Sequence, residues 1–174
     1  WYADTDADGY AYSGSTSLAC SQPSGFVIDN TDCDDADAGV NSGATEVCNT
    51  IDDDCDGTAD DGAVDATIWY VDADGDSYGN PGTGSLSCAQ LGGTVQDGTD
   101  CNDTGDATGL ATFPGSAPNE STPGACYTDA DGDDYGDVNA TGAVTAGTDC
   151  NDGDPATNQG STYYDDADAD LHGD

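Results

Sequence analysis

The chain has 174 residues and a formal net charge of −37, because it contains 37 acidic residues and neither lysine nor arginine. Without basic side chains it cannot make the phosphate contacts on which nucleic-acid binding depends, and an anionic membrane surface would repel it. Such a charge expands a chain by self-repulsion, and together with a mean hydropathy of −0.59 it would by itself favour disorder.

The arrangement of the residues nevertheless argues for a folded chain. Eight cysteines recur at related distances, aromatic residues stand beside aspartate clusters, and the aspartates are spaced two apart with glycine following. Apolar burial is too small to fold such a chain, so other cross-links must contribute. Because the sequence opens inside a repeat and is rich in cysteine, we expect a segment of a secreted protein at an extracellular or cell-surface location, without membrane insertion.

Internal repeats organise the sequence in chain order. Four segments start with an aromatic pair or Cys-Tyr and continue with aspartate at every second position: 1–12, 69–80, 126–137 and 163–174. A second pattern, beginning Thr-Asp-Cys and here called the TDC segment, follows the first three of them at 31–37, 99–106 and 148–154. A third pattern, at 48–62, occurs once. These patterns predict repeat 1 (1–68), repeat 2 (69–125), a shortened repeat 3 (126–162) and a partial repeat 4 (163–174).

Regular secondary structure should be sparse. Gly, Asp, Asn, Ser and Pro dominate and favour turns, and no helical apolar periodicity is present. Short strands are predicted at 26–29, 67–71 and 142–147. The expected fold is mostly irregular with small β elements, formed by tandem calcium loops stapled by disulfides.

The alternating aspartates predict calcium loops. Calcium takes six to eight oxygen ligands in flexible geometry, and glycine permits the sharp turn that brings alternate carboxylates together. A backbone carbonyl two residues after the last aspartate can join them. The candidate ligands of these Asp loops are Asp4, Asp6, Asp8 and Tyr10; Asp72, Asp74, Asp76 and Tyr78; Asp129, Asp131, Asp133 and Tyr135; and Asp166, Asp168, Asp170 and His172.

These loops are incomplete by themselves. An EF-hand ends in a bidentate glutamate at position twelve, where this chain has Thr83 or Ala140. The TDC carboxylates could complete the Asp loops, hold ions of their own or share ligands between neighbouring ions: Asp32, Asp35 and Asp37, with Val40; Asp100, Asp103 and Asp106; Asp149, Asp152 and Asp154. A further candidate comprises Asp52, Asp54, Asp56, Thr58 and Asp60 or Asp61, and Glu46 is placed to act as a bidentate ligand after Asp35.

Other interpretations of the acidic residues are weaker. Magnesium keeps its waters, while zinc and copper favour imidazole or thiolate, and His172 is the single histidine. A solvated acidic surface would not require the regular spacing and the glycines. Up to about eight Ca²⁺ ions would neutralise roughly 16 of the acidic charges, so metal binding and folding should be one coupled event.

The cysteine spacing predicts a disulfide framework. Cys20 to Cys33 and Cys88 to Cys101 both span 13 residues, which predicts two equivalent bridges. A Cys48–Cys55 bridge would flank the third pattern, and Cys126–Cys150 follows by elimination. The alternative is that some cysteines are free catalytic or metal-binding thiols.

Residues 31–57, TDCDDADAGVNSGATEVCNTIDDDCDG, resemble the metal-binding repeat of MopE-like secreted bacterial proteins, and the Asp loops resemble thrombospondin type 3 calcium repeats. The resemblance covers 1–62 best, 69–120 well and 126–174 in part. It implies an extracellular, calcium-rich and irregular structure of a cell-surface or adhesin-like protein. Copper binding in that family uses His and a modified Trp; with one histidine here, Trp1 and Trp69 are interpreted as packing residues.

No catalytic constellation is visible, so we expect a structural protein and not an enzyme. No TDC segment follows the fourth Asp loop, and a neighbouring subunit could supply its missing oxygens. Such a calcium-bridged, head-to-tail contact would grow a homopolymeric extracellular filament. The alternatives are a calcium-stiffened spacer or adhesin segment of a larger surface protein, and an acidic mineral-binding protein. Glycosylation sequons at Asn102, Asn119 and Asn139 make glycans candidate partners.

Overall fold

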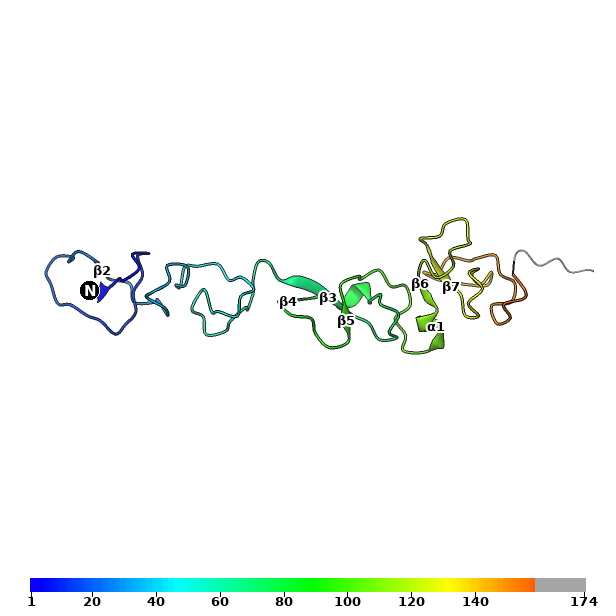
Figure 1. The fold of residues 1–174 in the computed structure, drawn as a ribbon, viewed down its shortest axis with the longest axis horizontal. Coiled ribbons are helices and arrows are strands. Elements are labelled where there is room, and N and C mark those ends of the chain that lie inside the picture. Colours follow the sequence, from blue (N-terminus) through cyan, green and yellow to red (C-terminus); the bar gives the residue numbers. More distant parts are fainter. Residues whose placement is uncertain (159–174) are drawn as a thin grey trace, which may run out of the picture. The chain divides into compact units, whose positions relative to one another are not determined.

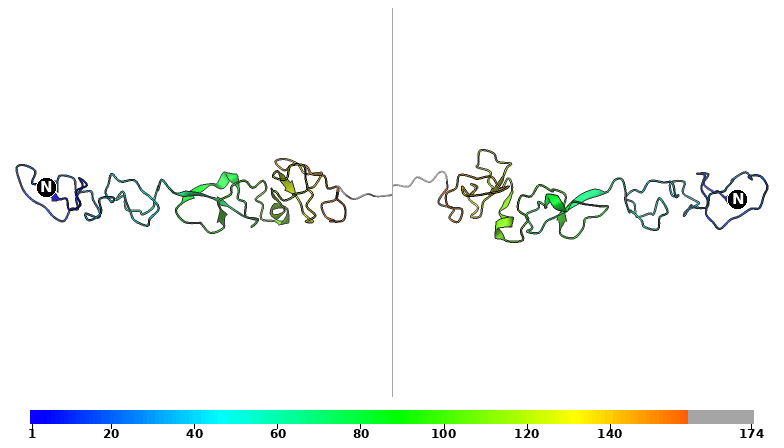
Figure 2. Two further views of the ribbon diagram at one scale, coloured as in Figure 1. Left: turned by 45° about the horizontal axis from the view of Figure 1, so that its top comes forward. Right: turned by 180° about the vertical axis from the view of Figure 1, so that it is seen from behind.

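The computed structural model describes residues 1–158, so the fourth Asp loop lies outside the described residues. Most of the ribbon between the labelled elements is irregular (Figure 1), as two further views also show (Figure 2). The elements are β1 (Tyr2–Ala3), β2 (Phe26–Val27), β3 (Thr67–Val71), the 3₁₀ turn η1 (Pro81–Thr83), β4 (Ser85–Ser87), β5 (Thr94–Val95), α1 (Ala107–Leu110), β6 (Thr112–Pro114) and β7 (Cys126–Thr128). The expected irregular fold with small strands is confirmed.

The strands form three small sheets. Strands β1 and β2 pair antiparallel, β3 lies between β4 and β5, and β6 pairs antiparallel with β7. Tyr2 is opposite Val27 in the first sheet, and Tyr70 is opposite Val95 in the second. Both partners of the second pair lie 68 positions after those of the first. Repeats 1 and 2 therefore share one local architecture, in which a strand brings the start of each Asp loop into register.

Two of the three predicted strands form. The 67–71 prediction matches β3, and two residues of 26–29 form β2. The strand predicted at 142–147 is wrong. Gly142 has a left-handed φ of +80°, and the Thr145 and Gly147 N–H groups donate to separate carbonyls, those of Cys126 and Asp137, at 2.7 and 2.9 Å. The segment is consequently a series of turns instead of one side of a ladder.

The interior of the described residues is more polar than apolar. Five hydrophobic residues are buried, against nine polar or charged ones, six of which are carboxylates: Asp32, Glu46, Asp53, Asp100, Glu120 and Asp149. Eleven large hydrophobic side chains are exposed. Apolar burial therefore contributes little to folding, and the buried carboxylates need compensation from hydrogen bonds or cations. Among residues 1–158 no helix has the length and apolar character needed to cross a membrane.

The chain divides into two compact units. Trp1–Thr67 and Leu86–Ala89 form unit 1, and Ile68–Ser85 with Gln90–Asp174 forms unit 2, as far as it is described. The division at residue 67 falls beside the predicted end of repeat 1. Repeats 2 and 3 belong to one unit, apart from the short piece of repeat 2 that contains Cys88. Each unit contains its own Asp loops and TDC segments.

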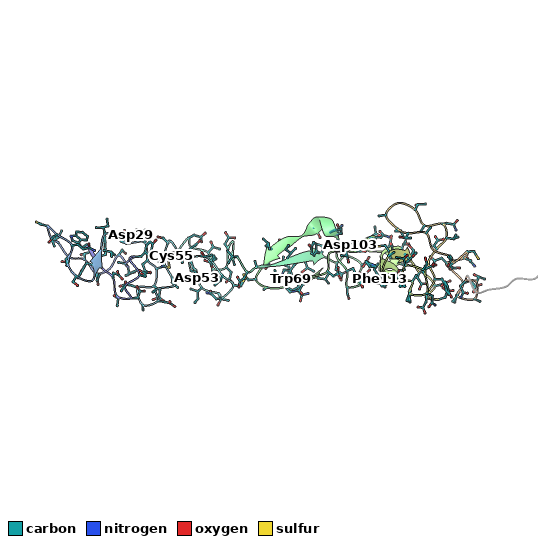
Figure 3. The ribbon with its side chains drawn as sticks, turned by 90° about the horizontal axis from the view of Figure 1, so that it is seen from above. Asp29, Asp53, Cys55, Trp69, Asp103 and Phe113 are labelled. Atoms are coloured by element: carbon teal, nitrogen blue, oxygen red, sulfur yellow. A yellow bond between two sulfur atoms is a disulfide. The ribbon has the colours of Figure 1, made fainter. Side chains whose placement is uncertain are left out.

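The disulfides differ from the predicted pairing. They join Cys33 to Cys55, Cys48 to Cys88 and Cys101 to Cys126, and leave Cys20 and Cys150 free and exposed. All four predicted pairs, Cys20–Cys33, Cys88–Cys101, Cys48–Cys55 and Cys126–Cys150, are therefore wrong. The reason is local, because Asp32 turns inward and is 5% exposed while the adjacent Cys33 is exposed. Cys33 bonds to Cys55 of the next loop, which is labelled in Figure 3.

Candidate metal centres

Each described Asp loop holds its carboxylates with the same backbone hydrogen bonds. The first aspartate accepts from the N–H three residues on, at 2.7 Å for Ala7 to Asp4 and 2.8 Å for Gly132 to Asp129. The third aspartate accepts from the aromatic residue two positions later: Tyr10 to Asp8, Tyr78 to Asp76 and Tyr135 to Asp133, at 2.7, 2.8 and 3.0 Å. One oxygen of the third aspartate is thereby fixed by the backbone, and in Asp76 and Asp133 the second oxygen has no hydrogen-bond partner.

Left-handed residues close these turns at the fourth and sixth loop positions. In repeat 2 they are Gly75 and Ser77, with φ of +89° and +80°. The other pairs are Ala7 with Gly9 and Gly132 with Asp134. Each loop has a glycine at one position and pays a steric cost at the other, since a side chain at positive φ is disfavoured by about 1–2 kcal/mol. This backbone turns alternate carboxylates toward one point.

The segment 52–58 is a loop of the same kind. Its fourth and sixth residues, Cys55 and Gly57, have φ of +58° and +102°. The Asp56 N–H donates to Asp54 at 3.2 Å, and the Thr58 N–H donates to Asp56 at 2.8 Å, as in the other loops. The third sequence pattern is therefore a further Asp loop, and its Cys55 links it to the TDC segment of repeat 1.

Carboxylates of the TDC segments lie beside those of the Asp loops. Carboxylate oxygens lie within 4.8 Å of one another in the groups Asp4, Asp6 and Asp8; Asp6, Asp32 and Asp35; Asp72, Asp74 and Asp76; and Asp74, Asp100 and Asp103. The backbone N–H of the second loop residue fixes each contact, at 2.9 Å for Thr5 to Asp35, 2.5 Å for Ala73 to Asp103 and 2.7 Å for Ala130 to Asp152. Asp103 is labelled in Figure 3.

The middle aspartate of the loop belongs to two groups at once. Asp6 lies with Asp4 and Asp8 and also with Asp32 and Asp35, and Asp74 has the same double role in repeat 2. A carboxylate has two oxygens and can bridge two cations. Of the three alternatives for the TDC carboxylates, the geometry favours shared ligands between two neighbouring positions.

Among residues 1–158, eight buried carboxylate oxygens have no hydrogen-bond partner, and they recur at equivalent positions. They are the Oδ2 atoms of the middle loop aspartates Asp6, Asp74 and Asp131, of the third loop aspartates Asp76 and Asp133, and of the TDC aspartates Asp32, Asp100 and Asp149. The TDC aspartates are 5%, 5% and 0% exposed. A buried polar group without a partner costs free energy, and a buried charge costs more. The recurrence of such atoms in each of repeats 1 to 3 calls for a cation.

The raised pKa values of the clustered carboxylates also point to a cation site. Burial, together with repulsion from neighbouring carboxylates, raises the pKa of Asp6, Asp32, Asp74 and Asp131, and raises the pKa of Asp76 and Asp152 to about 6. Like charges 4.8 Å apart repel by about 1 kcal/mol in water and about 3.5 kcal/mol at an effective dielectric constant of ~20. A divalent cation between them would reverse both effects.

Asn41 is a contributor that the sequence analysis missed. Its Nδ2 donates to Asp8 Oδ2 at 2.7 Å, and its Oδ1 accepts from the Gly43 N–H at 2.9 Å. Asn41 is 7% exposed. This bond explains why Asp8, unlike Asp76 and Asp133, has no orphaned oxygen. Asn lies nine residues after the TDC aspartate of repeat 1, and sequence spacing alone gives no signal for such a contact.

Glu46 lies in a different place from the one predicted. It was expected after Asp35, but the structure groups it with Asp52 and Asp54. Its carboxylate accepts from the Asp53 and Asp60 N–H groups at 3.0 and 2.6 Å, which hold the 52–58 loop around it. Glu120 has a related position in the sequence but a structural role, because it accepts from the N–H and hydroxyl of Thr148 at 2.6 and 2.8 Å.

Several other candidate ligands are engaged in local turns. Asp37 and Asp154 accept from Gly39 and Ala156, and Asp106 caps α1 through the Thr108 and Gly109 N–H groups, which lowers its pKa. Asp60 Oδ1 accepts from the Asn49 and Thr50 N–H groups, both at 2.9 Å. Val40 is buried, with its N–H donating to the Asp37 carbonyl. The predicted ligands Asp166, Asp168 and Asp170 lie outside the described residues.

The five named groups contain carboxylates alone. Oxygen donors suit hard cations, whereas copper favours imidazole or thiolate ligands. The free thiols of Cys20 and Cys150 are exposed and are absent from those five groups. The donor set of these five groups, all within residues 1–158, does not fit copper.

A family model described as "Putative metal-binding motif", from the copper-binding MopE family, matches residues 32–61 and 149–162. The chain carries this metal-binding motif twice. The first match contains the TDC aspartates of repeat 1, Glu46 and the 52–58 loop, and the second starts at the buried Asp149 of repeat 3. Of the clustered carboxylates, the first match includes Asp32, Asp35, Glu46, Asp52 and Asp54. No curated protein and no solved structure matches the chain.

Proposed function

We propose that this is a structural, non-enzymatic calcium-binding protein whose fold depends on the bound ions. The observation that carries the proposal is the set of eight buried carboxylate oxygens without partners, at equivalent places in three repeats. Each of these buried oxygens would cost free energy in a metal-free protein, and each becomes a ligand once a cation is present.

Calcium suits these groups better than other cations. It accepts many carboxylate oxygens at flexible geometry, and the loops crowd up to five carboxylates around a pair of positions, as with Asp4, Asp6, Asp8, Asp32 and Asp35. Magnesium demands near-octahedral geometry and dehydrates reluctantly. We propose two calcium ions for each of repeats 1 to 3, bridged by Asp6, Asp74 and Asp131, and one further ion in the 52–58 loop with Glu46.

Isothermal titration calorimetry of the metal-free chain with calcium, magnesium and copper(II) tests this proposal. The expected result is tight binding of several calcium ions, weak binding of magnesium, and no copper binding that competes with calcium. Circular dichroism followed during the titration should report folding as the sites fill. Tight copper binding that displaces calcium, or calcium binding without any spectral change, would contradict the proposal.

We further propose that the protein is the subunit of an extracellular filament. The support is that the Asp loops of repeats 1 and 2 lie with carboxylates of a separate TDC segment, and the fourth Asp loop sequence, at 163–172, would need the same oxygens. A second copy could provide these oxygens. The second candidate is a calcium-stiffened spacer of a larger surface protein, which the tandem repeats support equally.

Electron microscopy separates the two candidates. The filament proposal expects polymers in millimolar calcium that disperse on addition of a chelator and return on recalcification. Replacing Asp166 and Asp168 by alanine should block assembly and leave the calcium-dependent folding of repeats 1 to 3 intact. Persistent monomers at millimolar calcium would leave the spacer as the surviving candidate.

A further inference from the structure

Two cysteines are left over from the disulfide framework. Cys20 and Cys150 are free and exposed, and the Cys150 thiol has a weak contact of 3.9 Å to the Thr157 carbonyl. Residues 159–174 contain no cysteine that could pair with either. In a chain whose other six cysteines are all bonded, these two thiols need a separate explanation.

Cys20 occupies the same structural position as Cys88. The two lie 68 positions apart, the offset that relates β1–β2 to β3–β5. The hydrogen bonds beside them also correspond, since Gln22 donates to the Phe26 carbonyl and Gln90 donates to the Thr94 carbonyl, both at 2.7 Å. Cys88 is bonded to Cys48, which comes 40 residues earlier in the chain. A cysteine in this position is thus one that receives a bond from a preceding segment.

Cys150 occupies the position of Cys33 and Cys101. Each follows the buried TDC aspartate of its repeat, Asp32, Asp100 or Asp149. Cys33 and Cys101 both bond to a cysteine later in the chain, 22 and 25 residues on. A cysteine in this position is one that bonds to a following segment. Like Cys48, Cys150 also stands ahead of an Asp-loop sequence, the one at 163–172.

We propose that Cys150 of one copy and Cys20 of a second copy form a disulfide, so that copies are joined covalently head to tail. The two positions are complementary, because one bonds forward and the other backward within the chain. The contact joins different surfaces of the two copies, so it does not close on itself and extends into a fibre. The inference deepens the proposed filament and rests on that proposal for its partner, a second copy of this chain.

The bond forms by thiol–disulfide exchange with a low-molecular-weight disulfide such as oxidised glutathione. The thiolate of one cysteine attacks that disulfide and releases one glutathione thiolate, and the second cysteine then displaces the other. One protein disulfide forms and one glutathione disulfide is reduced to two thiols, with the protons of the two cysteines taken up by the leaving thiolates.

The test uses the calcium-loaded full chain in a glutathione redox buffer, analysed on a denaturing gel without reductant. The wild-type chain should give a ladder of oligomers that a reductant collapses to monomer. Cys20→Ser and Cys150→Ser should each remain monomeric alone, while their mixture should give dimers and no larger species. Both positions lie outside the three intrachain bonds, and calcium-dependent circular dichroism would confirm that the variants fold.

Peptic digestion and mass spectrometry of a mixture of ¹⁴N- and ¹⁵N-labelled chains would identify the linked peptides, since the sequence offers no trypsin site. Cys20 and Cys150 peptides carrying different labels are expected. Linked peptides that always carry the same label, symmetric dimers of either single variant, or a wild-type chain with two free thiols would each overturn the inference. If the wild-type chain keeps both thiols free and still forms calcium-dependent filaments under the microscope, the disulfide inference fails and the filament proposal stands. A covalent ladder without calcium-dependent filaments would instead support the disulfide and contradict the filament proposal.

Discussion

The buried TDC aspartate has opposite effects on the stability of the metal-free and metal-loaded states. Asp100 is 5% exposed, has one oxygen fixed by the Asn102 N–H at 2.9 Å, and has the other without a partner beside Asp74 and Asp103. Without metal this charge opposes folding, because it is buried among like charges. In the proposed metal-loaded state it would be a ligand. One substitution can therefore raise the stability of the metal-free state and lower that of the metal-loaded state.

Replacing Asp100 by Asn should raise the stability of the metal-free chain and lower calcium affinity in repeat 2 by about tenfold or more, which corresponds to about 1.4 kcal/mol. Asn keeps the size of the side chain and removes the charge. Urea unfolding in chelator and calorimetric titration with calcium measure the two effects. Asp97→Asn is the matched control, because the exposed Asp97 accepts from the Thr99 N–H and hydroxyl, at 3.1 and 2.5 Å. Equal losses of calcium affinity in both variants would argue against Asp100 as a ligand.

The raised pKa values of Asp76 and Asp152 predict opposite pH dependences for the two states. Both groups have a folded pKa of about 6 against an ordinary value of 3.8. In the metal-free chain the folded state holds protons that the unfolded state releases, so stability falls as pH rises from about 4 to 6. Calcium binding must displace these protons, so affinity rises over the same range.

Calorimetry in buffers of different ionisation enthalpy measures the released protons directly. Near pH 6 calcium binding should release protons, and at pH 8, where the carboxylates are already ionised, the release should vanish. An absence of proton release near pH 6 would show that these two carboxylates do not take part in binding.

At the scale of the element, the Asp loop depends on a backbone conformation with positive φ, which only some residues tolerate. Gly75 has φ of +89° at the fourth position of its loop, where repeat 1 has Ala7 at +70°. Alanine is therefore accepted there, whereas a β-branched residue at positive φ is a much stronger outlier. The turn sets the direction of the three carboxylates, so its strain is transmitted to metal binding.

We predict that Gly75→Val lowers the stability of the calcium-loaded chain by about 1–2 kcal/mol, the usual cost of a side chain in the left-handed region, and weakens calcium binding in repeat 2. Gly92→Val is the matched control, because an added Cβ at Gly92 meets nothing within 4 Å and its φ lies outside the positive range. Denaturant unfolding in calcium compares the two. Similar losses in both variants would mean that the loop accommodates the side chain.

Much of the loop architecture could be predicted from the sequence, because its cause is local. Aspartates two apart with a nearby glycine can hydrogen-bond the backbone between them, as Asp4 and Asp8 do. The return of the TDC segment to the loop could be expected from the incomplete ligand set. Which aspartates the two groups would share, as Asp6 and Asp74 are shared, required coordinates.

The features that could not be predicted depend on which way a side chain turns. The equal spacing of Cys20–Cys33 and Cys88–Cys101 suggested two bridges, but Asp32 turns inward, and the adjacent Cys33 turns outward to Cys55. Glu46 similarly serves the later loop, because the Asp53 and Asp60 N–H groups converge on it. Sequence spacing contains no information about these directions.

For the whole molecule, bound cations must provide the stabilisation that an apolar core provides in an ordinary domain. Five buried hydrophobic residues among residues 1–158 cannot offset the conformational entropy of the chain, and its charge of −37 opposes compaction. Disulfides restrict the unfolded state but leave the repulsion in place. Specific ion binding is the remaining contribution that both neutralises charge and orders the loops.

We therefore predict that removing calcium expands the chain and abolishes most of its tertiary structure while the three disulfides stay intact. Small-angle X-ray scattering should show a larger radius of gyration in chelator, and near-ultraviolet circular dichroism should lose the signal of ordered Tyr and Trp. Sodium chloride at high concentration is the control, because it screens charge without occupying the sites. Salt alone should reduce the expansion but leave the near-ultraviolet signal absent. If salt restores both the smaller radius of gyration and the near-ultraviolet signal as fully as calcium does, general screening would account for folding. The carboxylate groups would then not be specific metal sites.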